Sequence, residues 1–168
     1  MNILFITNYS KKFGGGHLNR CNKLAKKLVK KNNIFFLVDK KDHNISKLIV
    51  KNSTLILNKD IFSSDKTVKI LKDLRNPIVI IDSYQSNTKF EKKIYSLCHK
   101  LIVIDDQKKK HFCDVYINPN FLNFKFISKV DAKIKLVGTK FAFIDSEKIK
   151  KNYKKIKTKI FKNILVFM

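Results

Sequence analysis

A glycine-rich stretch that ends in a histidine is the part of this sequence best suited to chemistry. Gly14, Gly15 and Gly16 follow a short apolar run and stand directly before His17. Glycines permit positive φ and close backbone approach where a ligand meets a helix start. The positive end of the helix dipole disfavours an imidazolium there. We expect a ligand site in which a neutral His17 accepts a proton from water; a helix-capping loop with a surface histidine is the alternative.

The same stretch lacks the signatures of two common nucleotide sites. No Gly-Lys-Ser/Thr follows the glycines, and Asn19 stands where a dinucleotide-binding loop needs its last glycine. We therefore expect no cofactor. Arg20, one turn after His17, is either a partner for phosphate or carboxylate or a salt bridge that orients the loop.

Polar side chains follow the apolar runs that we interpret as strands. Asp82 and Tyr84 follow one such run, and Asn118 and Asn120 follow another. Ligands of open α/β sheets bind at the carboxyl ends of the strands. We expect Asp82 to orient His17, to bind a sugar hydroxyl, or only to cap the next helix. The two asparagines fit either a turn or ligand contacts.

A further acidic pair, Asp105 and Asp106, directly follows another of these apolar runs. We expect Asp105 to face the same crevice as the glycine loop. No histidine or third carboxylate is spaced to complete a metal site with this pair, and His111 and Cys113 form a poor metal pair. We therefore expect no bound metal.

The elements that must position these residues alternate along the chain. Short β-branched runs alternate with lysine-rich helical stretches, which is typical of a parallel sheet covered by helices. We predict an α/β, Rossmann-like, mostly parallel sheet with helices on both faces. The predicted strands are 2–7, 33–38, 54–57, 77–82, 100–105, 114–117 and 163–168. The predicted helices are 17–31, 43–51, 65–75, 87–98 and 146–158.

The first helix shows its buried face most clearly, through apolar residues three or four positions apart. These residues are Leu18, Cys21, Leu24, Ala25, Leu28 and Val29. The lysines of the helix, at 23, 26, 27 and 30, fall outside this face. We expect the helix to pack its apolar face on the sheet.

Length and composition limit the class of protein. The 168 residues, 44% of them hydrophobic, suffice for one domain or for half of a two-domain protein. The longest apolar runs fall far short of the roughly 20 residues of a membrane span, and the first residues lack the basic start of a signal peptide. We expect a cytoplasmic protein. Three cysteines without a Cys-x-x-Cys pair predict free, buried thiols.

The formal charge of +24 ordinarily points to nucleic acid or anionic lipid. Only Arg20 and Arg75 of the 37 basic residues are arginine, and the lysines are spread along the chain. Proteins that bind nucleic acids favour arginine over lysine and interleave aromatic residues with their basic residues. We therefore attribute the charge to the codon usage of an AT-rich genome and expect no nucleic-acid partner. A non-catalytic lysine-rich module that binds a polyanion is the alternative.

The last residues, 163–168, are an apolar run that predicts a buried strand. Complete domains seldom end in the middle of a sheet. We expect an N-terminal Rossmann-like domain over residues 1–162 and, in 163–168, the first strand of a further C-terminal domain.

Five motifs occur in order along nearly the whole chain. They are Gly-Gly-His17-x-x-Arg20-x-x-x-Leu24-Ala25, Ile81-Asp82-x-Tyr84, Val103-Ile104-Asp105-Asp106, Cys113-Asp114 leading to Asn118-x-Asn120, and Gly138-x-x-Phe141-Ala142-Phe143-Ile144. In order and spacing they resemble the UDP-2,4-diacetamido-2,4,6-trideoxy-β-L-altropyranose hydrolases of pseudaminic acid biosynthesis. That family is similar in fold to the MurG-like glycosyltransferases of the GT-B type, which have two Rossmann-like domains and a cleft between them.

The resemblance implies metal-free hydrolysis of a UDP-sugar to UDP and the free sugar. It assigns to His17 the activation of the attacking water, and to Tyr84 a contact with the sugar. It also implies that uracil and diphosphate bind largely to a second domain, so this portion alone should hold nucleotide weakly. A glycosyltransferase half-domain, in which His17 deprotonates an acceptor hydroxyl, is the alternative within the same fold.

Overall fold

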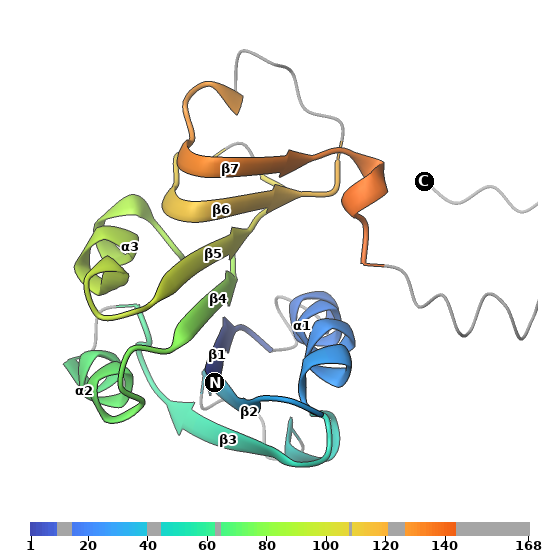
Figure 1. The fold of residues 1–168 in the computed structure, drawn as a ribbon, viewed down its shortest axis with the longest axis vertical. Helices are drawn as coiled ribbons and strands as arrows, with labels where there is room; N and C mark the ends of the chain where they lie inside the picture. The colour runs from blue at the N-terminus through green and yellow to red at the C-terminus, as the bar shows by residue number, and fades with distance from the viewer. Residues whose placement is uncertain (10–14, 40–44, 63–64, 108, 121–126, 144–168) are drawn as a thin grey trace, which may run out of the picture.

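One parallel sheet of seven strands organises the described part of the chain (Figure 1). The computed structural model describes residues 1–9, 15–39, 45–62, 65–107, 109–120 and 127–143. The strands are β1 (Asn2–Thr7), β2 (Asn33–Asp39), β3 (Ser53–Asn58), β4 (Ile78–Asp82), β5 (Lys100–Ile104), β6 (Phe112–Asn118) and β7 (Asp131–Val137). They lie in the order β3-β2-β1-β4-β5-β6-β7. The predicted α/β, Rossmann-like class is confirmed.

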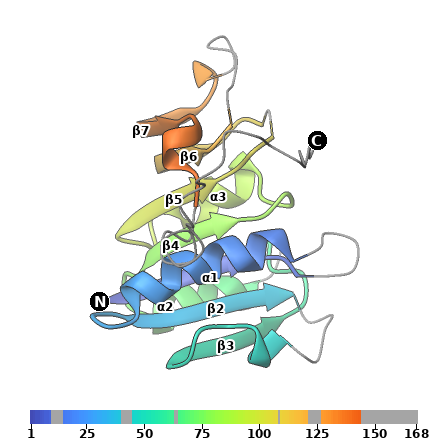
Figure 2. The same cartoon turned by 90° about the vertical axis from the view of Figure 1, so that its right-hand side faces the viewer.

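The helices cover both faces of this sheet, as Figures 1 and 2 show from two sides. Helix α1 (Gly16–Leu28) lies on one face, and α2 (Asp65–Asp73) and α3 (Thr88–Tyr95) lie on the other. Asn87 caps α3 by accepting a hydrogen bond from the Phe90 amide at 3.0 Å. Two short 3₁₀ helices, η1 (Ile45–Lys47) and η2 (Thr139–Phe141), complete the described helices. None of these helices combines the length and the apolar character needed to cross a membrane.

Two apolar layers, one on each side of the sheet, hold these elements together. On the α1 side, Leu18, Cys21 and Ala25 are buried against the central strands, where the rings of Phe5 and Phe36 stack 5.1 Å apart. The apolar face predicted for α1 is therefore confirmed. The second layer packs α2 and α3 on the opposite face, through Leu71, Phe90 and Ile94. Strands buried on both faces explain the near-continuous apolar runs of β1, β2 and β4.

The main correction concerns β7, which was not predicted. This strand pairs with β6 in parallel, for example Val115 with Ile134 and Tyr116 with Lys135. Its sequence alternates apolar and lysine residues, and Ile134 is 52% exposed. The strand lies at the edge of the sheet, where only part of its surface needs apolar side chains, so it lacks the continuous apolar run of the central strands.

A second correction concerns the predicted helix 43–51. The described part of that range holds only the single 3₁₀ turn η1, in which Ile45 is buried. Asn52 then turns the chain with a φ of 63°, which no α-helix continues through. The predicted helix 146–158, the strand 163–168 and the domain boundary at 162 lie outside the described residues.

Candidate active site

The candidate site lies where the order of the strands reverses. From β1 the chain moves outward to β2 and β3, and β4 then pairs with the other side of β1. The carboxyl ends of β1 and β4 are adjacent, because Thr7 pairs with Asp82 in the parallel register. Such a reversal leaves a crevice at the carboxyl edge, since the connecting helices leave to opposite faces of the sheet. The glycine loop after β1 and the acidic end of β4 therefore meet there.

His17 and Asp82 form the centre of this site. The Nδ1 atom of His17 lies 2.7 Å from Oδ1 of Asp82, and the two residues are 4% and 0% exposed. An ionised carboxylate only accepts hydrogen bonds, so Nδ1 carries the proton of this contact. In the neutral ring, Nε2 then holds the free lone pair. No residue in the described part of the chain is a hydrogen-bonding partner for Nε2.

Arg20 fixes the Asp82 carboxylate from a second direction. Its Nε donates to Oδ2 at 2.7 Å and its Nη2 donates to Oδ1 at 2.6 Å, a two-point contact that sets the plane of the carboxylate. A longer contact of 3.4 Å joins Nη1 to Asp106. Burial alone would lower the pKa of Arg20, but Asp82 and Asp106 together raise it above the ordinary value. The guanidinium therefore stays charged and acts as the salt bridge that orients the site.

Tyr84 covers the imidazole of His17. The two rings meet edge to face with centroids 4.3 Å apart and an interplanar angle of 88°. Burial and a hydrogen bond with Asp106 raise the pKa of Tyr84 to about 12, so the phenol is neutral near pH 7. Lys109 donates from Nζ to the Tyr84 carbonyl oxygen and lies 6.0 Å from the ring centroid. Tyr84 thus packs its ring against the histidine, while its neutral hydroxyl donates to Asp106.

A cavity of about 360 Å³ opens beside the glycine loop, at the start of α1. Gly15 is the residue before α1 and makes no side-chain cap, so backbone N–H groups of the first turn face this region without a capping side chain. The residues that line the cavity are Tyr9, Gly15, Gly16, Leu18, Asn19, Asn22 and Leu48. Gly14, the third predicted glycine, lies outside the described residues. His17 does not line this cavity and points instead to the end of β4.

Two polar residues missed by the sequence reasoning, Asn8 and Ser83, join the ends of β1 and β4. Ser83 donates from Oγ to the side-chain oxygen of Asn8, whose amide in turn donates to Gln85 at 2.7 Å. Both Asn8 and Ser83 are buried. The sequence signal that could have identified them was their position directly after the strands. Their contacts hold together the two loops that carry the site.

The remaining predicted site residues lie apart from this centre. Asp105 is buried and contacts His111 rather than the crevice around His17. Asn118 is fully buried, donates to the Tyr116 hydroxyl at 2.9 Å and accepts from the Asn120 amide at 2.9 Å. Asn120 is exposed just beyond β6. In this structure Asp105 and Asn118 make internal contacts, and Asp106 is the member of the acidic pair that reaches the site.

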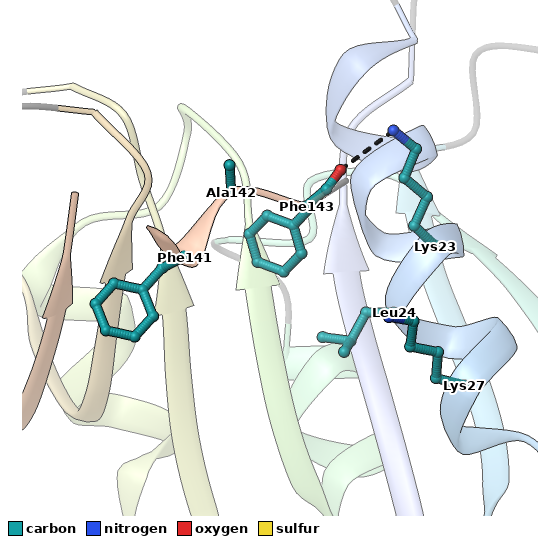
Figure 3. A pocket seen from close by; sticks show the side chains of 6 residues that line it. All are labelled: Lys23, Leu24, Lys27, Phe141, Ala142 and Phe143. Atoms are coloured by element: carbon teal, nitrogen blue, oxygen red, sulfur yellow. Dashed lines mark hydrogen bonds between the residues drawn. The ribbon is translucent and has the colours of Figure 1, made fainter. Parts of the chain in front are cut away.

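A second cavity, of about 220 Å³, lies between α1 and the segment 141–143 (Figure 3). Leu24 and Phe143 face it, and the Lys23 ammonium donates to the Phe143 carbonyl oxygen at 3.2 Å. The described residues that line it include no acid, histidine or thiol, and Lys23 and Lys27 are its titratable groups.

Metal binding and thiol chemistry find no support in the site. Within the described ranges, no three histidine, cysteine or acidic side chains are grouped to hold a metal ion. Cys21 lies under Asp82, with its Sγ 3.8 Å from Oδ2, and burial raises the pKa of its thiol well above the usual value. All three cysteines are free, and Cys98 is only partly buried. Within the described residues, the site thus offers an imidazole rather than a thiolate for proton transfer.

Comparison with known proteins gives a relative but no family assignment. No family model matches the chain. An uncharacterized protein of Methanocaldococcus jannaschii is 30% identical over 176 aligned residues, which cover 99% of this chain and 36% of that protein. The chain thus spans about a third of the length of the relative it matches.

Proposed function

We propose that this chain is the N-terminal half of a nucleotide-sugar hydrolase. The substrate would be a UDP-linked 2,4-diacetamido-2,4,6-trideoxy sugar, split to UDP and the free sugar. The observation that carries the proposal is the contact of 2.7 Å between His17 and Asp82 at the strand reversal. This contact prepares one nitrogen of a nearly buried imidazole to accept a proton.

The geometry suits the activation of water. Asp82 holds the proton on Nδ1, so Nε2 of His17 takes a proton from a water molecule. The water oxygen then bonds to the anomeric carbon, and the bond from that carbon to the phosphate oxygen breaks with its electron pair leaving on UDP. UDP is a good leaving group, so the step needs an oriented water and a shielded base more than a covalent nucleophile.

The motifs that suggested this family contribute the residues around the base. Three side chains that the sequence analysis singled out, Arg20, Asp82 and Tyr84, contact His17 or one another. Arg20 and Asp82 set the orientation of the imidazole, and the neutral hydroxyl of Tyr84 is suited to a sugar hydroxyl or acetamido group. As the resemblance implies, the nucleotide would bind mainly to a second domain, so this chain alone should hold it weakly.

The test is the release of UDP by the full-length protein from a small set of UDP-sugars, with and without a chelator. We expect His17→Leu to lower the rate by about 10²- to 10⁴-fold, the usual contribution of a positioned base. His99→Leu is the matched control, because His99 is exposed and lies outside the site. Full activity of His17→Leu would remove the histidine from the mechanism.

A glycosyltransferase is the second candidate. The cavity of about 360 Å³ beside Gly15 and Gly16 lies at the start of α1, the helix that carries His17, although His17 does not line it. In that reaction the same Nε2 would deprotonate an acceptor hydroxyl instead of water. UDP release without any acceptor supports the hydrolase, whereas release that requires an added acceptor supports the transferase.

A further inference from the structure

A second histidine, His111, lies between two buried carboxylates away from His17. Its Nδ1 is 2.8 Å from Oε1 of Glu91, and its Nε2 is 3.0 Å from Oδ2 of Asp105. None of the three residues is more than 2% exposed. Each ionised carboxylate can only accept, so both ring nitrogens must donate. The geometry therefore requires an imidazolium whenever both carboxylates are ionised.

The surroundings favour the charged ring. Burial by itself would lower the pKa of His111, but the contacts with Asp105 and Glu91 outweigh it and raise the pKa to about 9. The ring stacks on Tyr116 at 5.5 Å, and Cys113 follows on the same strand. Burial and other nearby groups raise the pKa values of both Tyr116 and Cys113 to about 12, so these two stay neutral where His111 titrates.

The three residues close the connection between β5 and β6. Asp105 is the first residue after β5, and His111 is the last before β6. Their contact joins the two ends of the connection. Glu91, from α3, ties the same point to the helix, because its Oε2 also accepts the Phe112 amide at 2.8 Å. The imidazolium thus holds together a helix and two strand ends.

The connection that His111 closes carries two residues to the candidate active site. Asp106 contacts Arg20 at 3.4 Å and contributes to the raised pKa of Tyr84. Lys109 donates to the Tyr84 carbonyl oxygen. Both contacts originate between Asp105 and His111, so their positions depend on how the connection is held.

We propose that His111 is a positioning residue of the site: as an imidazolium it holds the β5–β6 connection closed and so keeps Asp106 and Lys109 against Arg20 and Tyr84. The proposal concerns the arrangement of the site, and only its effect on turnover rests on the proposed function. It links the cluster of Glu91, Asp105 and His111 to His17 through described contacts alone.

The first measurement is a titration of the unaltered chain, followed by NMR of its histidine and tyrosine rings. We expect both nitrogens of His111 to be protonated near pH 7 and the ring to lose a proton as the pH rises through about 9. The Tyr84 and His17 ring signals should move in step with it, although Tyr84 itself titrates only near 12. A neutral His111 near pH 7, or Tyr84 and His17 signals that stay fixed, overturns the proposal.

The second measurement compares His111→Gln with His99→Gln, the same change at an exposed histidine. Glutamine cannot supply a positive charge to both carboxylates. We expect His111→Gln to shift the Tyr84 and His17 ring signals of the folded protein, and His99→Gln to leave them in place. A folded His111→Gln variant with unshifted signals refutes the positioning role. If that variant does not fold, the titration of the unaltered chain decides the question.

These measurements distinguish the positioning role of His111 from the proposed hydrolase activity. If the full-length protein hydrolyses a UDP-sugar, His111→Gln should lower kcat more than it raises KM, while His99→Gln should alter neither. If no hydrolysis is found, the NMR results still accept or reject the role of His111, because they depend on the contacts of the site and not on turnover.

Discussion

Replacing Asp82 by asparagine tests the reasoning about the site most directly. The carboxylate accepts from His17, from two nitrogens of Arg20 and, weakly, from Cys21. An asparagine keeps the shape but has one accepting oxygen and one amide group that donates. If the amide takes the Oδ2 position it faces Nε of Arg20, and if it takes the Oδ1 position it faces both Nη2 of Arg20 and Nδ1 of His17. In either orientation one of the two Arg20 contacts must therefore be lost.

The expected cost follows from the burial of the pair. Removing one partner of a buried ion pair costs about 3 to 5 kcal/mol, because the other charge is left without compensation. The Arg20 side chain is 15% exposed and keeps its contact with Asp106, so some solvation and one carboxylate remain. We expect Asp82→Asn to lower the free energy of unfolding by about 3 kcal/mol, the lower end of that range.

In the second of these orientations the same substitution should change the proton position on His17. If the new amide group donates to Nδ1, the ring proton moves to Nε2 and the lone pair that would accept the proton of water is lost. In a serine protease, an aspartate-to-asparagine change that left the catalytic histidine in the wrong tautomer lowered kcat by about 10⁴. This gives the scale of the effect on any reaction that uses Nε2. Nitrogen-15 NMR of the His17 ring distinguishes the two tautomers directly.

Chemical denaturation and the ring NMR spectrum of Asp82→Asn are the two assays. Asp73→Asn is the matched control, because Asp73 is exposed at the end of α2 and the same change there should cost less than about 0.5 kcal/mol. If Asp82→Asn is as stable as this control and His17 keeps its proton on Nδ1, the account of the site is wrong.

Three further predictions concern the fold. Burial alone would raise the pKa of Asp114, but the Leu101 amide, Lys133 and Tyr95 lower it to about 2. The contribution of Asp114 to stability is therefore complete above about pH 4 and is lost as the pH falls toward 2. Asp114→Asn should therefore weaken the fall in the free energy of unfolding between these two pH values. An unchanged fall in the variant contradicts this. The three thiols should react slowly with a thiol reagent near pH 7 in the native protein and quickly in denaturant. The reason is that burial raises the pKa of Cys98 and Cys113 to about 12 and that of Cys21 well above its usual value. Fast labelling of the native protein would argue against this burial. Phe5→Ala should lower the free energy of unfolding by about 3 to 5 kcal/mol, because it leaves a cavity between the sheet and α1. Leu57→Ala, at an exposed leucine, is the control and should cost far less. Equal losses for the two variants in chemical denaturation would place Phe5 outside the core.

The sequence predicted six of the seven described strands, the edge strand β3 among them, and the clearest of these strands are buried on both sides. Strands β1, β2, β4 and β5 must be apolar at nearly every position, because helices or neighbouring segments cover both faces of the sheet there. Such runs are visible without any knowledge of tertiary structure. The edge strand β7 has lysines at 133 and 135 and an exposed Ile134, so its pattern resembles that of a surface segment.

The candidate site could be predicted to a similar extent and for a related reason. His17 and Asp82 are 65 positions apart in the sequence, yet a parallel sheet brings the ends of neighbouring strands to one edge. That rule requires only the location of each strand end. It does not give the orientation of side chains, so it also placed Asp105 and Asn118 in the crevice, although both make internal hydrogen bonds.

The cluster around His111 could not be predicted by such a rule. Glu91 is followed by two lysines, as on a solvated helix face, and its contact with His111 spans 20 positions. One signal was present: Phe90 and Ile94 of α3 are buried, and Glu91 lies beside them on the helix. A carboxylate on an apolar helix face needs a partner of opposite charge, which is the criterion that would have led to His111.

Two histidines of the described residues are buried, and they differ in the number of carboxylates that each contacts, which determines what each can do. His111 faces two acceptors, so both of its nitrogens are occupied and it can hold structure but cannot accept a further proton. His17 faces one carboxylate, which Arg20 also engages, and its second nitrogen has no partner among the described residues. A carboxylate added near Nε2 of His17 would make the two alike. Among the described residues, the arrangement at His17 therefore differs from that at His111 by this second acceptor as well as by the Arg20 contact.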